Sequence, residues 1–339
     1  MANPPLLSPR ELARLISSLE RGDAEAQRRI FTLYRRPPRA HVIGITGAPG
    51  CGKSTLIAAL ARVWRRQGST VAILSVDPSS PFTGGAILGD RIRMGELSQD
   101  PGVFIRSMAS RGAQGGVARA AADAAIALDA AGFERIVIET VGAGQSDINI
   151  VHLADTVVVV EAPGLGDDIQ AIKAGILEIA DVLVVNKADR PEAEATFNAL
   201  AAALELGDVV AGHHGPAGTA GHITARPASE RLANANGWRV PLLKVSALRA
   251  EGVEAVAESI VSHQRWQAAH PERRAQERAA QALREHLQSM LLRAALDKIG
   301  NQQFDAWAAR CAARELHPAE AAAQLLAAVM KEGKTRDCA

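Results

Sequence analysis

The sequence predicts an α/β fold built on a doubly wound, mostly parallel sheet, and three observations support this assignment. Between His41 and about Ser262, short runs rich in β-branched residues alternate with segments of helical periodicity. Several runs are apolar throughout, as parallel strands covered by helices on both faces should be. Polar, glycine-rich segments follow several runs, at the carboxyl strand ends where such folds bind ligands. We expect strands at Val42–Thr46, Val71–Val76, Val103–Ser107, Arg135–Glu139, Thr156–Glu161, Val182–Asn186 and Leu242–Val245.

Helical segments flank this α/β region and divide the chain into three parts. Residues 1–40 form the first part, in which apolar residues recur at helical spacing. We place the α/β domain at residues 41–265 and, within it, a glycine-rich loop insertion at residues 211–238. The alanine-rich remainder, residues 266–339, carries apolar helical faces and little other core for them to cover. We therefore expect it to form a separate helical arm.

Composition argues against a nucleic-acid or membrane partner. The chain has 339 residues, with 38 Lys and Arg against 37 Asp and Glu, so no broad basic surface is expected. Its apolar runs are far too short to span a bilayer, and its first residues include charges where a signal peptide would be apolar. Cys51, Cys311 and Cys338 lack the paired spacing of a metal site or a disulfide framework. We expect a soluble cytoplasmic protein, or an organellar one whose targeting segment is absent.

A glycine-rich motif joins the first predicted strand to the helix that follows it. The motif is a phosphate loop, Gly47-Ala48-Pro49-Gly50-Cys51-Gly52-Lys53-Ser54, extended into the helix by Thr55. Glycines let backbone N–H groups turn inward around phosphate oxygens, because a Cβ would block both a positive φ and the close approach. In this pattern Lys53 contacts the β- and γ-phosphates and Ser54 binds Mg²⁺. The motif therefore predicts a site for a nucleoside triphosphate and its metal ion.

Acidic residues at the ends of two other strands are candidates to bind that metal ion. Asp77 follows the second strand and Asp90 lies farther along a long polar loop; Mg²⁺ takes one or two such carboxylates and keeps several waters. Glu139 ends the fourth strand and Gly142 follows three residues later, an arrangement that senses a γ-phosphate. Gln145 is a candidate to orient the attacking water, although a glutamine in a glycine loop is as often only solvated.

Two motifs after the last strands predict a guanine-binding site. They are Asn186-Lys187-Ala188-Asp189 and Ser246-Ala247-Leu248. Asp189 can accept hydrogen bonds from guanine N1–H and the exocyclic amino group, which adenine cannot supply in the same places. We expect Asn186 and Lys187 to brace the loops and pack on the base, and the Ala247 N–H to meet guanine O6. These residues favour GTP over ATP.

The motifs together resemble the MeaB/ArgK/MMAA family of GTPases, the metallochaperones of adenosylcobalamin-dependent acyl-CoA mutases. The resemblance rests on the phosphate loop and on residues 76–94, 139–146 and 186–189, and it covers residues 41–190 closely. It implies a P-loop GTPase fold that binds GTP or GDP and Mg²⁺. By position, it implies phosphate and metal roles for Lys53, Ser54, Asp77, Asp90 and Glu139.

The resemblance further implies a partner and a regulatory loop. Residues 163–175 resemble the family's additional switch, in which the lysine matching Lys173 aids activated hydrolysis. The residues alone indicate only a strand-to-helix loop with a solvated lysine. The family's C-terminal arm builds a homodimer, and its GTPase gates adenosylcobalamin loading and protects or reactivates the mutase. We expect slow hydrolysis by the isolated protein, because no arginine finger is evident, and stimulation by a mutase whose identity the sequence leaves open.

Two other functions remain open at this point. One is a small-molecule kinase on a P-loop fold, which would need adenine tolerance that Asp189 argues against. The other is a nickel- or cobalt-insertion GTPase, suggested by His213, His214 and His222 in the loop insertion. A solvated insertion is the more common reason for histidines on such a loop, and Cys51 alone does not complete a metal site near the switches.

Overall fold

The computed structural model describes residues 7–77, 95–109, 116–140, 153–164, 179–211, 237–269 and 271–332. The chain divides into two compact units, Met1–Pro271 and Glu272–Ala339. None of the described helices is both long and apolar enough to cross a membrane.

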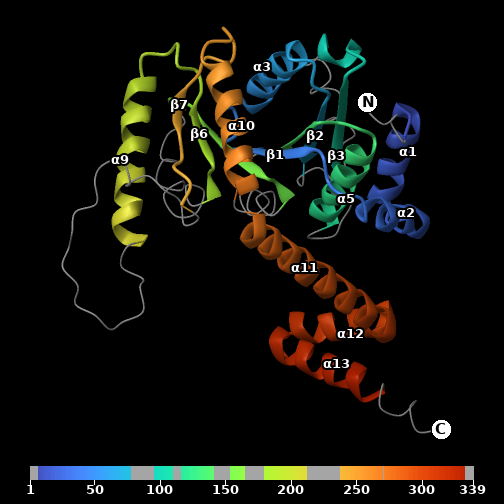
Figure 1. Cartoon of the computed structure of the whole chain (residues 1–339). Coiled ribbons are helices and arrows are strands. Elements are labelled where there is room, and N and C mark those ends of the chain that lie inside the picture. Colours follow the sequence, from blue (N-terminus) through green and yellow to red (C-terminus); the bar gives the residue numbers. More distant parts are fainter. Residues whose placement is uncertain are drawn as a thin grey trace. The chain divides into compact units, whose positions relative to one another are not determined.

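The first unit contains a parallel sheet with the strand order β3-β2-β4-β1-β5-β6-β7 (Figure 1). Each strand is hydrogen-bonded in parallel to its neighbours in this order. The predicted doubly wound fold is therefore confirmed, and β1, which precedes the phosphate loop, lies near the middle of the sheet between β4 and β5. The strands are β1 His41–Thr46, β2 Val71–Asp77, β3 Val103–Ala109, β4 Arg135–Thr140, β5 Thr156–Glu161, β6 Val182–Val185 and β7 Leu242–Lys244.

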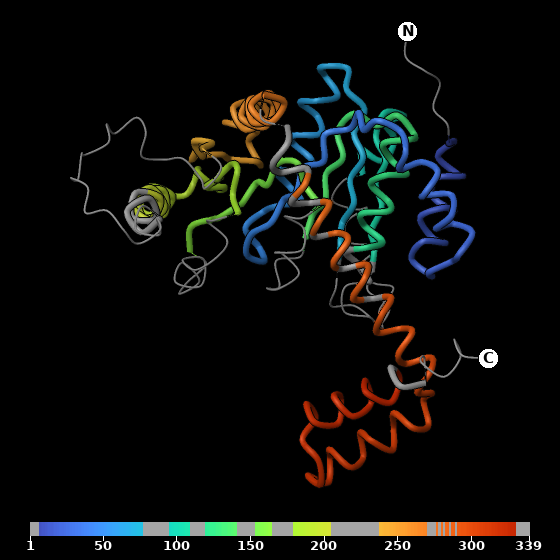
Figure 2. Tube along the Cα trace, turned by 60° about the horizontal axis from the view of Figure 1, so that its bottom comes forward, coloured from blue at the N-terminus to red at the C-terminus, as the bar shows by residue number. Residues whose placement is uncertain are grey.

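Helices cover both faces of the sheet, as its apolar strands require. The helices α3 (Lys53–Arg66) and α10 (Val253–Ala269) pack on one face. The helices α5 (Gly116–Ala130) and α9 (Ala193–Ala211) pack on the other face (Figure 2). Between strands, the short 3-10 turn η1 (Leu97–Gln99) packs near α3.

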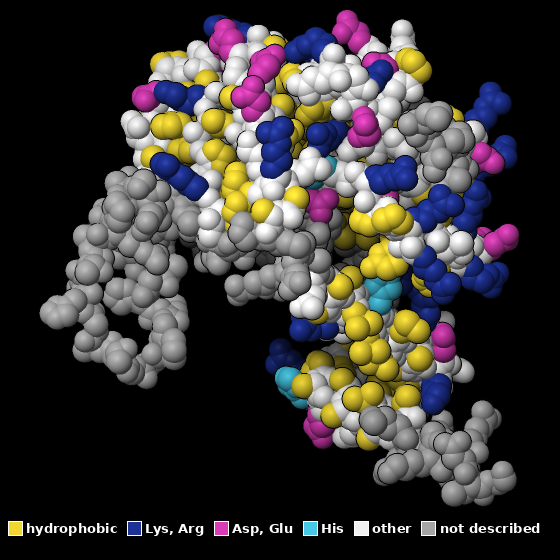
Figure 3. All heavy atoms as spheres, in the orientation of Figure 1, with side chains coloured by type: hydrophobic (Ala, Val, Ile, Leu, Met, Phe, Trp, Pro, Cys, Tyr) yellow, Lys and Arg dark blue, Asp and Glu magenta, His cyan; other side chains and the backbone are white. Residues whose placement is uncertain are grey.

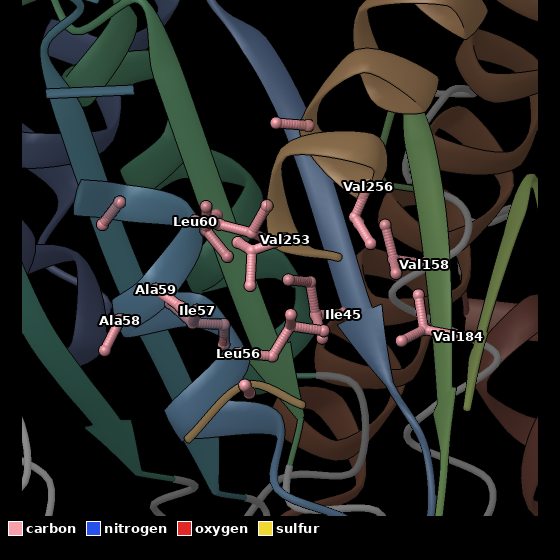
Figure 4. Close-up of a cluster of buried hydrophobic side chains, with 14 of the residues drawn as sticks. Ile45, Leu56, Ile57, Ala58, Ala59, Leu60, Val158, Val184, Val253 and Val256 are labelled. Carbon is pink, nitrogen blue, oxygen red and sulfur yellow. The ribbon is translucent and has the colours of Figure 1, made fainter. Parts of the chain in front are cut away.

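Side chains alternate between these two layers along each strand, as the pleat of a strand requires. Ile45 of β1 and Val158 of β5 lie in the core beneath α3 and α10, together with Leu56 and Val253 (Figure 4). Ala72 and Leu74 of β2 point to the α5 side. The core beneath α3 holds the start of that helix, and with it the phosphate loop, in a fixed position against the sheet.

The helices α1 (Pro9–Glu20) and α2 (Ala24–Tyr34) belong to the first unit and pack on α5. α1 begins with a capping box, in which the Glu11 backbone N–H donates to the Ser8 hydroxyl and the Ser8 backbone N–H donates to the Glu11 carboxylate. Its apolar stripe is buried at Leu12, Leu15, Ile16 and Leu19. The N-terminal segment therefore extends the core on the α5 side.

The second unit consists of the helices α11 (Pro271–Ile299), α12 (Asn301–Ala312) and α13 (Pro318–Glu332). Ala321 and Leu325 of α13 are buried within it. Hydrophobic side chains gather on the visible face of these helices (Figure 3). The exposed large ones are Leu283, Leu287, Met290, Leu291, Leu292, Phe304 and Leu326. An apolar surface of this kind is typical of a protein interface, and the predicted homodimer stays a prediction.

A chain of hydrogen bonds runs along the amino edge of the sheet, opposite the phosphate loop. Arg135 Nη1 lies 3.2 Å from His41 Nδ1, and His41 Nε2 lies 2.8 Å from Thr156 Oγ1. Thr156 Oγ1 lies 2.8 Å from His263 Nδ1, and His263 Nε2 lies 3.3 Å from Asp181 Oδ1. A guanidinium can only donate, so His41 Nδ1 accepts and its proton is on Nε2. His41 Nε2–H then donates to Thr156 Oγ1, and the Thr156 hydroxyl donates to His263 Nδ1. His263 Nε2 faces the Asp181 carboxylate in a polar contact.

This chain ties the starts of four strands to α10. Thr156 and His263 are fully buried, and His41 and Asp181 are only 1% exposed. In such a low-dielectric setting an unpaired polar group is costly, so the network specifies one arrangement of α10 against the sheet. α10 follows the loop that contains Ser246–Leu248, and its position helps to fix that loop.

Thr156→Val tests this interpretation of the amino edge. The change replaces the hydroxyl by a methyl group of similar size and removes the hydrogen bond that each imidazole makes to Oγ1. We expect the free energy of unfolding to fall by about 1–3 kcal/mol for each buried group left unpaired, measured by urea denaturation. Thr32→Val, which alters an exposed hydroxyl on α2, is the matched control; equal losses in the two variants would contradict the interpretation.

Candidate nucleotide-binding site

The phosphate loop adopts a conformation that depends on its glycines. Gly47, Gly50 and Gly52 have φ angles of +143°, +78° and +95°. A Cβ at Gly47 would overlap the Val160 carbonyl oxygen, and one at Gly52 would overlap the Asn186 side chain. Gly52 caps α3 without a side-chain hydrogen bond. The first N–H groups of α3 therefore remain directed at the loop, where a helix N-terminus favours an anion.

Lys53 is the first residue of α3, and its side chain folds back across the loop. It is only 6% exposed. Its Nζ donates to the Gly47 carbonyl at 2.8 Å and to the Ala48 carbonyl at 3.1 Å. The ammonium group therefore lies within the glycine loop, where it can neutralise the charge of a bound phosphate group. Thr55, the next predicted loop residue after Ser54, is exposed in the first turn of α3.

Ser54 and Glu139, predicted from separate motifs to share a metal ion, are in direct contact. Ser54 Oγ donates to Glu139 Oε1 at 2.7 Å. Ser75 Oγ of β2 donates to the other carboxylate oxygen at 3.4 Å. Glu139 is only 7% exposed. The result is a compact set of hard oxygen atoms beside the phosphate loop, and such oxygen atoms are the ligands that Mg²⁺ prefers.

Ser75 is a site residue that the sequence reading missed. It stands within the apolar run of β2, in register with Glu139 of β4. The signal in the sequence is the Ser75 hydroxyl itself, which stands two residues before the end of β2 and follows four apolar residues. Glu161 ends β5 as predicted, its side chain is buried, and its backbone carbonyl accepts from Asn186 N–H at 2.7 Å.

Of the remaining predicted metal and switch residues, the structure describes Asp77. Asp77 is the last residue of β2, directly after Val76, which is paired with Thr140. Its backbone is therefore at the same carboxyl edge of the sheet as Glu139. The other candidates, Asp90, Gly142, Gln145 and Lys173, lie outside the described residues. Within the described part of the chain, no group of three or more His, Cys, Asp or Glu side chains could hold a metal ion.

The two predicted base-recognition motifs are braced against the phosphate loop. Asn186 Nδ2 donates to the Cys51 carbonyl at 2.9 Å, and Asn186 Oδ1 accepts from the Ala247 N–H at 3.1 Å. Lys187 Nζ donates to the Gly50 carbonyl at 2.7 Å. The Ala247 N–H that we expected at guanine O6 is thus paired with Asn186 in this structure. One amide side chain links three loops that lie far apart in the sequence.

Asp189 lies beside Ser246 at the outer end of these loops. Ser246 Oγ donates to Asp189 Oδ1 at 2.6 Å. This hydrogen bond is the main cause that lowers the pKa of Asp189, which keeps an exposed carboxylate ionised. Ser246 itself is buried, whereas Leu248, two residues later, is 84% exposed. The carboxylate is therefore oriented and charged as a hydrogen-bond acceptor.

Cys51 occupies a variable position of the loop and is fully buried. Burial is the largest cause that raises the pKa of its thiol to about 11. The thiol is therefore protonated near neutral pH and packs as a small apolar group.

Comparisons with known proteins identify the family and support the fold. The family model described as Methylmalonyl Co-A mutase-associated GTPase MeaB matches residues 12–299. A candidate GTPase of Pyrococcus horikoshii is 46% identical over 257 residues, which cover 76% of this chain and 74% of that protein. GTPase ArgK of Escherichia coli is 44% identical over 147 residues, 43% of this chain and 44% of that protein.

A third relative and a solved structure extend these findings. The mitochondrial methylmalonic aciduria type A homolog of Caenorhabditis briggsae is 41% identical over 166 residues, 49% of this chain and 40% of that protein. The crystal structure of an LAO/AO transport system kinase shares the fold, with a TM-score of 0.58 and 23% identity over 96% of this chain and 99% of that chain. The chain therefore belongs to the MeaB/ArgK/MMAA family of P-loop GTPases.

Proposed function

We propose that this protein is a Mg²⁺-dependent GTPase that serves an adenosylcobalamin-dependent acyl-CoA mutase. Its GTP- and GDP-bound states would gate adenosylcobalamin loading and protect or reactivate the mutase. The observation that carries the GTPase part is the contact of Ser54 with Glu139 beside the glycine loop. The mutase part is supported by the family, whose name associates it with methylmalonyl-CoA mutase.

The residues around the phosphate loop have the chemistry that GTP hydrolysis requires. Lys53 would exchange its two carbonyl contacts for oxygens of the β- and γ-phosphates, while the loop N–H groups hold the remaining phosphate oxygens. Ser54 and Glu139 would hold Mg²⁺, with Asp77 and Asp90 as further ligands of the ion or its waters. When bound, the ion supplies positive charge that neutralises the β- and γ-phosphate oxygens.

The base-recognition loops favour guanine. Asp189 would accept two hydrogen bonds from the Watson–Crick edge of guanine, and Ser246 holds that carboxylate in place. Asn186 and Lys187 brace the loop against the phosphate loop, and Leu248 is exposed beside it. This chemistry, together with family membership, favours a GTPase over the kinase and the nickel- or cobalt-insertion functions.

Signal transmission would depend on the switch segments. The Gly142 N–H would sense the γ-phosphate, Gln145 would orient water, and Lys173 would aid hydrolysis when the mutase is bound. We propose slow turnover in the isolated protein, because no arginine finger is evident in the sequence, and faster turnover when the mutase is bound. The apolar surface of α11–α13 would form a homodimer, and the protein would act in the cytoplasm.

GTP turnover in the presence of a mutase tests the proposed function. We expect a slow Mg²⁺-dependent rate for the protein alone and a clear stimulation by one of the methylmalonyl-, isobutyryl-, 2-hydroxyisobutyryl- or ethylmalonyl-CoA mutases, each assayed in apo and cofactor-loaded form. ATP is the nucleotide control and Lys53→Ala the inactive control. A rate that no mutase changes would contradict the chaperone role, and ATP consumption driven by a small molecule would favour the kinase.

Asp189→Asn tests how the base is read. The amide nitrogen would donate where the carboxylate accepts, so guanine N–H groups would lose their partner, whereas the C2 carbonyl of xanthine would gain one. We expect the affinity for GTP to fall by about tenfold or more and the affinity for XTP to rise, measured by equilibrium binding. Asp305→Asn, which changes an exposed aspartate of α12, is the control. Unchanged GTP-over-XTP preference would show that the base is read elsewhere.

A further inference from the structure

The outer face of α2 has a composition that packing in the first unit does not explain. The inner face of this helix is occupied, because Ala26 and Ile30 are buried in the core shared with α1 and α5. On the outer face, Phe31 is 62% exposed and Tyr34 is 67% exposed. Residues three apart lie on the same side of a helix, so the two rings form one aromatic patch.

This patch is unusual for a chain so poor in aromatic residues. Phenylalanine, tryptophan and tyrosine together make up 3% of the sequence, and Tyr34 is its single tyrosine. Among the described residues of the first unit, the large hydrophobic side chains that are exposed are Phe31, Tyr34 and Leu248. Leu248 belongs to the second predicted base-recognition motif, Ser246-Ala247-Leu248. The two aromatic residues of α2 have no comparable reason to face solvent.

Arginines flank the aromatic patch. Their acidic neighbours include Asp23, whose pKa Arg28 helps to lower, and Glu11, whose pKa Arg29 helps to lower. From residue 26 to residue 40 the sequence contains no Asp or Glu. Within the described residues, none of the arginines between residues 26 and 40 forms a close ion pair, and all of them are exposed. By contrast, Arg65 of α3 pairs with Asp100 and Arg106 of β3 pairs with Glu20. The arginines of this stretch, none of which makes a close ion pair within the described residues, are Arg28, Arg29, Arg35, Arg36 and Arg39. Lys and Arg side chains are prominent on the side of the molecule where α1 and α2 lie (Figure 3).

We propose that this surface, the Phe31/Tyr34 face of α2 with its arginine rim, docks an acidic surface of the client mutase. Tyrosine, phenylalanine and arginine are enriched at the energetic centres of protein interfaces. The rings fit an apolar depression, and Arg28 and Arg35, one helical turn on either side of Phe31, fit carboxylates at its rim. This inference rests on the proposed function, which it deepens by assigning the mutase a docking site outside the nucleotide loops.

The charge distribution favours a protein over a nucleic acid at this surface. The five arginines carry +5, whereas the formal net charge of the whole chain is +1, so the rest of the chain is net acidic. A protein that binds a nucleic-acid duplex tightly contacts about 6–10 of its phosphates. Outside this patch, the net acidic remainder of the chain would repel those phosphates. A second copy of this chain is also disfavoured, because the apolar surface suited to self-association is on α11–α13. An acidic patch on another protein satisfies both the charge and the exposed rings.

Binding of the full-length protein to the mutase that stimulates it tests the proposal. The variants are Phe31→Ser with Tyr34→Ser, and Arg28→Glu with Arg35→Glu. Arg10→Glu with Arg14→Glu makes the same charge change at exposed positions of α1 and is the control. We expect each α2 pair to weaken mutase binding by about tenfold or more, and the charge pair to flatten its salt dependence. Basal GTP turnover and Tm should stay unchanged, because all four side chains are exposed.

The possible outcomes separate this proposal from the proposed function. If wild type and α2 variants bind the mutase equally, the docking site is wrong and the mutase role stands. If no mutase binds the wild type, both are wrong. A change in oligomeric state of the variants by light scattering, with mutase affinity retained, would make the surface a contact between copies. Binding of a single-stranded RNA oligomer that only the α2 changes abolish, with mutase affinity retained, would make it a nucleic-acid site.

Discussion

The hydrogen bond between Ser54 and Glu139 is the contact on which the site depends. It joins the first turn of α3 to the end of β4, two elements that are 85 residues apart in the chain. The contact is possible because β1, which leads into the phosphate loop, pairs directly with β4. Core packing beneath α3 and the polar chain at the amino edge hold these elements rigidly. Accurate placement of one hydroxyl and one carboxylate thus depends on the whole sheet.

The base-recognition loops depend on the same frame through Asn186. Its amide group donates to the phosphate loop and accepts from the Ala247 N–H, so the three loops cannot move independently. Gly52 has no room for a Cβ because this amide occupies the space. Phosphate and base recognition are therefore one connected polar structure, with Asp189 at its outer end. The switch residues Gly142, Gln145 and Lys173, which respond to the nucleotide in our proposal, lie outside the described residues.

Much of this arrangement could be predicted from the sequence, because local chemistry determines it. The glycine spacing of the phosphate loop, the apolar strands and the acid at the end of β4 each have a local physical reason. The amino-edge chain could not be predicted, since His41, Thr156 and His263 come together only through strand order and helix docking. Ser75 was missed for the same reason: its role follows from its register with Glu139. The exposure of Phe31 and Tyr34 likewise required the packing of α2 on α5 to be known.

The most direct test of the central claim is a double-mutant cycle on Ser54 and Glu139. Mg²⁺-dependent GTP affinity is measured for wild type, Ser54→Ala, Glu139→Gln and the double variant, with GTP affinity in EDTA as the reference. If the two residues hold one ion, each single change weakens Mg²⁺-dependent binding strongly and the double change adds little, because the losses of coupled residues are not additive. Additive losses, or binding that does not respond to Mg²⁺, would contradict a shared metal site.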